Sequence, residues 1–209
     1  MHLKTIHEGF VMDSKAVAFI AMMSALGNVL FLISYYLGPI AQGVALDFSL
    51  VGVFIAGLYG GPLVGFITGL FAGVLPGIYF GPLSTGSWLG LIGLPIGKSL
   101  TGLTAGLLYK GFKVNKRNRQ SILTVPLVAA SYIPEFIFTI FYFVSLLPFF
   151  IGGGGAGILV FVLPKAWAEI IVMSFLMAAL VGNQGFSKFV NNFFSYRKKF
   201  ERDTSSLSR

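Results

Sequence analysis

The stretch Asp47–Gly77, DFSLVGVFIAGLYGGPLVGFITGLFAGVLPG, carries one charge at its start and none after it, and glycine stands at every fourth position from 57 to 81. In lipid, helices associate through close packing, and a small residue every fourth position forms a groove in which another helix can lie. The sequence Gly60-Gly61-Pro62 interrupts the run and favours a turn. The stretch therefore predicts two membrane helices joined by a tight turn, the second packed along its glycine face.

The composition of the whole chain agrees with a membrane location. Of its 209 residues, 56% are hydrophobic and 11% are charged, whereas soluble domains have about 25% charged residues. With about 20 residues for each spanning helix, the chain has room for about six spans and no separate soluble domain. It contains no cysteine, which excludes disulfides, iron–sulfur centres and thiol catalysis.

The apolar runs predict an all-α integral membrane protein with a bundle of six transmembrane helices. The fifth run is the longest, and we expect it to be tilted, kinked at Pro134 or extended beyond the membrane. A cytoplasmic segment (1–15) precedes the transmembrane domain (16–185), and a basic cytoplasmic tail (186–209) follows it. The predicted spans are 16–37, 45–60, 62–80, 87–109, 121–148 and 157–183.

The basic residues predict the orientation of the bundle. They gather before the first span, in the loop 110–119 and after the sixth span, whereas the loops 38–44, 81–86 and 149–156 contain no lysine or arginine. Positive residues remain on the cytoplasmic side, so both termini are expected in the cytoplasm. The net charge of +8 is then a topology signal or a lipid-headgroup contact rather than a nucleic-acid footprint.

Four elements of the sequence carry a family resemblance: Ala21-x-x-x-Ala25 in the first span, Asp-Phe-Ser before the second, GLYGGPLVGFITGLFAG, and GKSLTGLTAGLLYK at 97–110. In this order the chain resembles the substrate-binding S component of energy-coupling factor (ECF) transporters. The similarity covers most of residues 15–110, and spans five and six fit by length and topology. The Asp-Phe-Ser element is most similar to the riboflavin-binding branch.

The resemblance implies a subunit of the prokaryotic plasma membrane that captures a vitamin or a similar small metabolite at the outer face. Transport would be energised by two cytoplasmic ATPases through a transmembrane scaffold subunit, and no cofactor is implied. In that family the small residues of the first span dock the scaffold, which corresponds here to Ala21 and Ala25; ordinary packing within the bundle is the alternative. The chain itself is not expected to be an enzyme, because GLPIGKS (93–99) lacks the spacing of a phosphate-binding loop.

Five charged residues fall inside the predicted spans. A charge at membrane depth costs at least about 2.5–3.5 kcal/mol, so such residues face the bundle interior and mark a substrate path or a partner. Lys165 and Glu169 are four residues apart and can pair on one helix face. Asp47 has two open roles, a structural cap or a functional group. The five are Asp47, Lys98, Glu135, Lys165 and Glu169.

Polar and aromatic residues complete the predicted substrate site. In the resembled family the site is built from spans four to six and the external loops. We expect a small, flat, amphipathic ligand, with Lys98 or Lys165 meeting an acidic or carbonyl group and Glu135 or Glu169 meeting a donor. Apolar walls with a few convergent polar groups are typical of such sites. The further candidate residues are Trp88, Trp167, Tyr132, Tyr79 and Asn28.

Other functions stay open at this point. A self-sufficient secondary transporter could use Glu135 or Glu169 to carry a coupling proton, although no inverted repeat is evident. A membrane enzyme acting on lipid could use lysine and glutamate as acid and base. No metal site is predicted, because the only histidines are His2 and His7. The external loop 149–158 is either a mobile lid or a slack connection.

Overall fold

The computed structural model describes residues 13–37, 39–41, 44–45, 47–84, 87–114, 119–152 and 155–193. Two short antiparallel strands, β1 (Pro39–Ala41) and β2 (Val44–Ala45), follow the first helix, and a further helical stretch covers 184–193. The other elements are helical, with η1 and η3 of π type: α1 (Ser14–Tyr36), α2 (Leu50–Ile55), η1 (Ala56–Gly60), α3 (Pro62–Ala72), α4 (Val74–Phe80), α5 (Leu89–Gly111), α6 (Gln120–Ser131), α7 (Ile133–Phe141), η3 (Tyr142–Leu146), α8 (Leu147–Ile151) and α9 (Ala156–Gly182).

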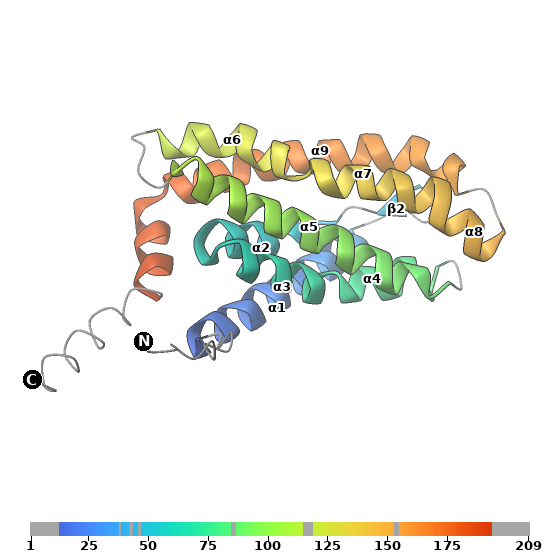
Figure 1. Cartoon of the computed structure of the whole chain (residues 1–209), viewed down its shortest axis with the longest axis horizontal. Coiled ribbons are helices and arrows are strands. Elements are labelled where there is room, and N and C mark those ends of the chain that lie inside the picture. Colours follow the sequence, from blue (N-terminus) through green and yellow to red (C-terminus); the bar gives the residue numbers. More distant parts are fainter. Residues whose placement is uncertain are drawn as a thin grey trace, which may run out of the picture.

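The helices form an elongated bundle with α5 in its middle (Figure 1). Helices α1 to α4 lie on one side of α5, and α6 to α9 lie on the other side. Helix α5 makes its most extensive contact with α3 and also contacts α7, while α6 packs along α9. Buried side chains of α2 and α9, such as Phe54, Ile170, Met173 and Met177, form part of the core.

Within the described residues, five helical segments are long and apolar enough to cross a membrane: Ser14–Tyr36, Pro62–Phe80, Leu89–Gly111, Gln120–Ile151 and Ala156–Gly182. The predicted second span, 45–60, is only partly a helix, because the apolar helical segment there is the shorter Leu50–Gly60. Asp47 is not helical; its carboxylate accepts a hydrogen bond from the Ser49 backbone N–H at 2.9 Å. This local turn competes with the helix and delays its start.

The predicted turn between the second and third spans is confirmed. Gly61 has φ of 95°, a left-handed conformation that favours glycine. Pro62 then occupies the start of α3, where its fixed φ suits a helix and its missing N–H costs nothing.

The glycine face of α3 lies directly against the backbone of α5. A Cβ atom at Gly65 would overlap the carbonyl of Gly102, one at Gly69 would overlap the carbonyl of Lys98, and one at Gly73 would overlap Pro95. The predicted packing is therefore confirmed, and the partner is α5. Because Gly69 touches the backbone of Lys98, the glycine face also fixes the position of this lysine.

The longest predicted span is one helical segment with a break near its centre. Helix α6 ends at Ser131 and α7 begins at Ile133. Pro134 follows directly, and proline lacks the N–H that would bond the carbonyl of Ala130. The kink expected at Pro134 is therefore found just before it, at Tyr132, whose side chain is buried.

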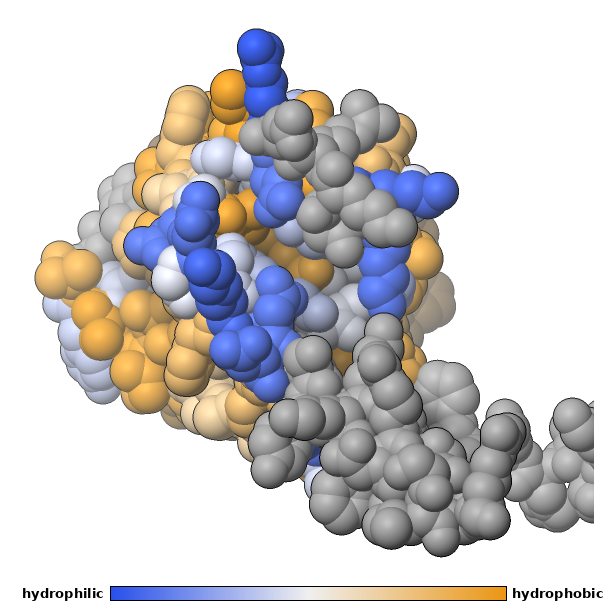
Figure 2. Space-filling view, turned by 90° about the vertical axis from the view of Figure 1, so that its left-hand side faces the viewer, coloured by the Kyte–Doolittle hydropathy of each residue, from blue (hydrophilic) through white to orange (hydrophobic). Residues whose placement is uncertain are grey.

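The surface of the bundle differs between its flanks and its ends. Large apolar side chains are exposed along the helices, among them Phe141, Val160 and Phe175. One end carries hydrophilic side chains around a hollow (Figure 2). An apolar flank with a polar end suits a protein surrounded by lipid.

Candidate functional site

A cavity of about 500 Å³ lies between α5, α7, η3 and α9. Its walls are largely apolar and partly aromatic, with Tyr132, Phe138, Tyr142 and Phe143 among the lining residues. Asp47 and Leu50, at the beginning of the short α2, also line it. The volume and the apolar walls are those of a small-molecule site, since such pockets measure about 300–1,000 Å³.

All five charged residues of the predicted spans line this one cavity: Asp47, Lys98, Glu135, Lys165 and Glu169. They come from four different parts of the fold, the segment before α2 and the helices α5, α7 and α9. Lys98 follows Leu89, the first residue of α5, by nine residues, which corresponds to about 14 Å along the helix. This is about half the thickness of the hydrocarbon core.

The Lys98 ammonium forms an ion pair with Asp47. Its Nζ lies 2.6 Å from Asp47 Oδ2, and both side chains are nearly inaccessible, with 4% and 9% exposed. Ser49 donates its backbone N–H to the other carboxylate oxygen. The pair thus connects the segment before α2 to the centre of α5.

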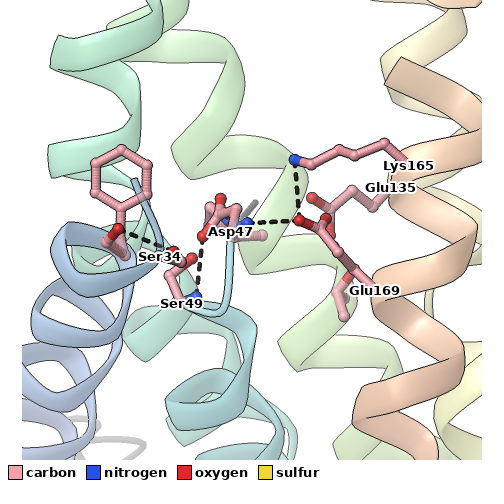
Figure 3. A network of polar contacts seen from close by, with 9 residues as sticks. Ser34, Asp47, Ser49, Glu135, Lys165 and Glu169 are labelled. Carbon is pink, nitrogen blue, oxygen red and sulfur yellow. Dashed lines mark hydrogen bonds and ion pairs between the residues drawn. The ribbon is translucent and has the colours of Figure 1, made fainter. Parts of the chain in front are cut away.

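Lys165 and Glu169 form a second ion pair, one turn apart on α9. Lys165 Nζ lies 3.2 Å from Glu169 Oε1, as the four-residue spacing predicted. The same oxygen accepts a hydrogen bond from the backbone N–H of Asp47. Figure 3 shows this chain of contacts, which links the two ion pairs through Asp47.

Glu135 is the fifth charged group. It stands in the first turn of α7, and its Oε2 accepts a hydrogen bond from the Thr101 hydroxyl on α5. Its side chain lies over Gly97, where an added Cβ would be 3.3 Å from Glu135 Cγ. Within the part of the chain that the structure describes, Glu135 takes part in neither of the two ion pairs.

The structure brings together five of the nine predicted substrate residues: Lys98, Glu135, Lys165, Glu169 and Tyr132 all line the cavity. Trp167 packs edge-on against Tyr132, with ring centroids 6.0 Å apart, and stands behind the cavity wall. Trp88 is 70% exposed at the beginning of α5. Neither tryptophan is among the residues that line the cavity.

Asn28 and Tyr79 lie away from the cavity, on the α1 side of the bundle. The Asn28 side-chain amide donates a hydrogen bond to the Phe71 carbonyl at 3.1 Å. The Tyr79 hydroxyl lies 3.4 Å from that of Tyr36. In this structure both residues connect α1 to the α3–α4 segment.

Sequence reasoning placed Asp47 at the outer end of the second predicted span, 45–60, and left its role open. The structure puts it at the centre of the charged network, because α2 begins only at Leu50. The sequence did single out Asp47 by its charge, because the segments 16–109 and 120–187 together contain only five charged residues. Thr101 gave no comparable signal, since hydroxyl residues are common in membrane helices.

The two residues of the predicted docking face, Ala21 and Ala25, are exposed on α1. Val17 and Val29 continue the same face at four-residue spacing and are about half exposed. The face is thus available to a partner, and docking there stays a prediction.

A second cavity of about 550 Å³ lies at the end where α5 finishes and α6 begins, and Lys110 and Lys188 are among its lining residues. In Figure 2 hydrophilic side chains surround a hollow at this end. Lys110 and Lys188 are exposed to solvent, so no ligand is needed to balance the cost of burying their charges. The first cavity, with its buried charges, is therefore the candidate functional site.

Fold and cavity together define a multi-pass membrane protein with a small-molecule site inside its helix bundle. The family model of the ECF transporter substrate-specific component matches residues 15–181. The chain belongs to this family of substrate-binding membrane subunits. Comparisons with curated proteins and with solved structures found no match.

Proposed function

We propose that this protein captures a small, flat, amphipathic metabolite in the cavity between α5, α7 and α9. Family membership implies a small-molecule substrate, a membrane scaffold and ATPases. The substrate enters from the outer face, with both termini in the cytoplasm. ATP hydrolysis by the partner ATPases then reorients the bundle and exposes the cavity to the cytoplasm.

The observation that carries this proposal is the convergence of all five charged residues of the predicted spans on one cavity with largely apolar walls. Ion pairs needed only for folding have no reason to surround an open space, because burying charge is costly even when it is paired. A binding site does have such a reason, since a few oriented polar groups in an apolar pocket provide specificity.

Native mass spectrometry of the protein, gently extracted from its own host membrane, tests the proposal. We expect a complex with the scaffold and two ATPases, or the subunit with a retained small molecule. A bare monomer or homodimer without either would contradict it. Uptake in vesicles that follows the proton gradient instead of ATP would favour the secondary transporter.

A substitution that fills the cavity localises the site. Ala166 lines the cavity and is 8% exposed, so Ala166→Phe is expected to reduce retention of the small molecule at least tenfold by steric exclusion. The matched control on the same helix is Val172→Phe, at a position exposed on the flank, and retention there should be unchanged. Equal retention by the two variants would place the ligand elsewhere.

The docking face on α1 gives a separate prediction. Ala21→Trp combined with Ala25→Trp is expected to abolish assembly with the scaffold, because large side chains prevent close helix approach. Pull-down from membranes measures this loss. Ile137→Trp with Phe141→Trp, on the exposed face of α7, is the control. A double α1 variant that assembles as the wild type does would contradict docking there.

A further inference from the structure

The charges of the membrane domain do not balance, and their count is complete. Between residues 16 and 109 the only charged residues are Asp47 and Lys98, and between 120 and 187 they are Glu135, Lys165 and Glu169. The cavity that they line therefore has three carboxylates against two ammonium groups. No other charged side chain of these two segments can supply the missing positive charge.

The imbalance falls on one residue. Lys98 pairs with Asp47 and Lys165 pairs with Glu169, and Asp47 is further held by the backbone of Ser49. Glu135 has a hydroxyl partner, Thr101. The Thr101 hydroxyl carries no charge that could balance a carboxylate, so Glu135 is the carboxyl group of the cavity that stands outside both ion pairs.

The position of Glu135 makes it available to a ligand. Glu135 lines the cavity, and its side chain packs against α5 at Gly97. The absence of a side chain at Gly97 leaves room for the carboxyl group. Figure 3 shows the carboxyl groups of Glu135 and Glu169, which come from different helices, near the same part of the site. One oxygen of Glu135 is bonded to Thr101, and no hydrogen bond to the other oxygen is formed within the described residues.

The walls around this carboxylate also favour a positive group. Aromatic rings present a negative face, and a cation near such a face is attracted to it. Tyr132, Phe138 and Tyr142 line the same cavity as Glu135. A carboxylate with aromatic side chains in the same cavity is a suitable environment for a cationic nitrogen.

We infer that the substrate carries a cationic nitrogen that pairs with Glu135. This inference rests on the proposed function and specifies its substrate class. The ligand supplies the positive charge that the bundle lacks, so the occupied site is close to neutral. The sequence suggested an acidic or carbonyl group of the substrate for a lysine and a donor for a glutamate. Both lysines are paired with carboxylates, whereas Glu135 is in neither ion pair, so a donor that carries positive charge is the better match.

Two measurements on the wild type and the Glu135→Gln variant test the inference. The first identifies small molecules released from the purified proteins and compares binding of thiamine, a cationic probe, with biotin, an anionic one. We expect the released compound to be cationic at neutral pH, and the substitution to lower its retention at least tenfold. Thiamine should also bind the wild type more tightly than biotin does.

The second measurement is the stability of the ligand-free proteins. Because Glu135→Gln removes a charge that has no ion-pair partner and keeps the shape of the side chain, the variant is expected to be at least as stable as the wild type. Loss of stability without ligand would show that Glu135 has a partner inside the protein and would overturn the inference.

Other outcomes distinguish this inference from the proposed function. A neutral or anionic compound retained equally by both proteins would overturn the inference and leave the capture of a small molecule intact. If nothing is released and neither probe binds, while scaffold and ATPases are present, the cationic substrate is overturned. If the scaffold and the ATPases are absent as well, both the cationic substrate and the proposed function are overturned.

Discussion

Lys98→Met is expected to destabilise the ligand-free protein by about 3–5 kcal/mol, because it leaves the carboxylate of Asp47 buried without its cation. The ion pair is 2.6 Å long, and both side chains are nearly inaccessible. The free energy of unfolding, measured in mixed micelles by denaturant titration, checks this value.

The double variant Asp47→Asn with Lys98→Met tests whether the loss of stability comes from leaving one buried charge without its partner. Replacing both partners removes the unpaired charge, so the double variant is expected to recover much of the lost stability. Lys188→Met, at an exposed lysine near the basic end, is the control and should change stability by less than about 0.5 kcal/mol. A single Lys98→Met variant as stable as the wild type would show that the pair contributes nothing.

Gly69→Ala is the second substitution with a large expected effect. The added Cβ would lie 2.6 Å from the carbonyl carbon of Lys98 and equally close to Ser99 Cα. Backbone atoms cannot rotate away, so α3 and α5 must separate, at a cost of about 3 kcal/mol, the upper end for overpacking. The unfolding titration that measures Lys98→Met also measures this loss.

Gly157→Ala is the matched control for a helical glycine. It lies in α9, and no atom is within 4 Å of its added Cβ. Alanine favours a helix over glycine by about 1 kcal/mol, so this variant should be equal to or more stable than the wild type. We also expect Gly69→Ala to weaken ligand retention, since it displaces the helix that carries Lys98. Equal stability of the two alanine variants would contradict close α3–α5 packing.

The sequence predicted best the features that depend on residues near each other in the chain. The turn at Gly61–Pro62 follows from the local conformational preferences of glycine and proline. The Lys165–Glu169 pair follows from the helical repeat. Five of the six apolar runs correspond to helices of spanning length, because hydrophobic length is itself what a bilayer selects.

The sequence could not predict the contacts between distant segments. It grouped Trp88, Trp167, Asn28 and Tyr79 with the charged residues, whereas in the folded chain these four do not line the cavity. An aromatic or amide side chain serves a lipid interface, a helix contact or a ligand equally well, so its type alone does not decide its place.

By itself, the sequence determined that this is a helical membrane protein with five charges too costly to leave in lipid. Only the tertiary structure decided which charges pair. Lys98 contacts Asp47, 51 positions away along the chain. This contact forms because α2 begins only after Asp47 and because the glycine face of α3 lets the backbones of α3 and α5 pack in direct contact. With Lys98 paired to Asp47 and Lys165 paired to Glu169, Glu135 faces the cavity without an ion-pair partner of its own.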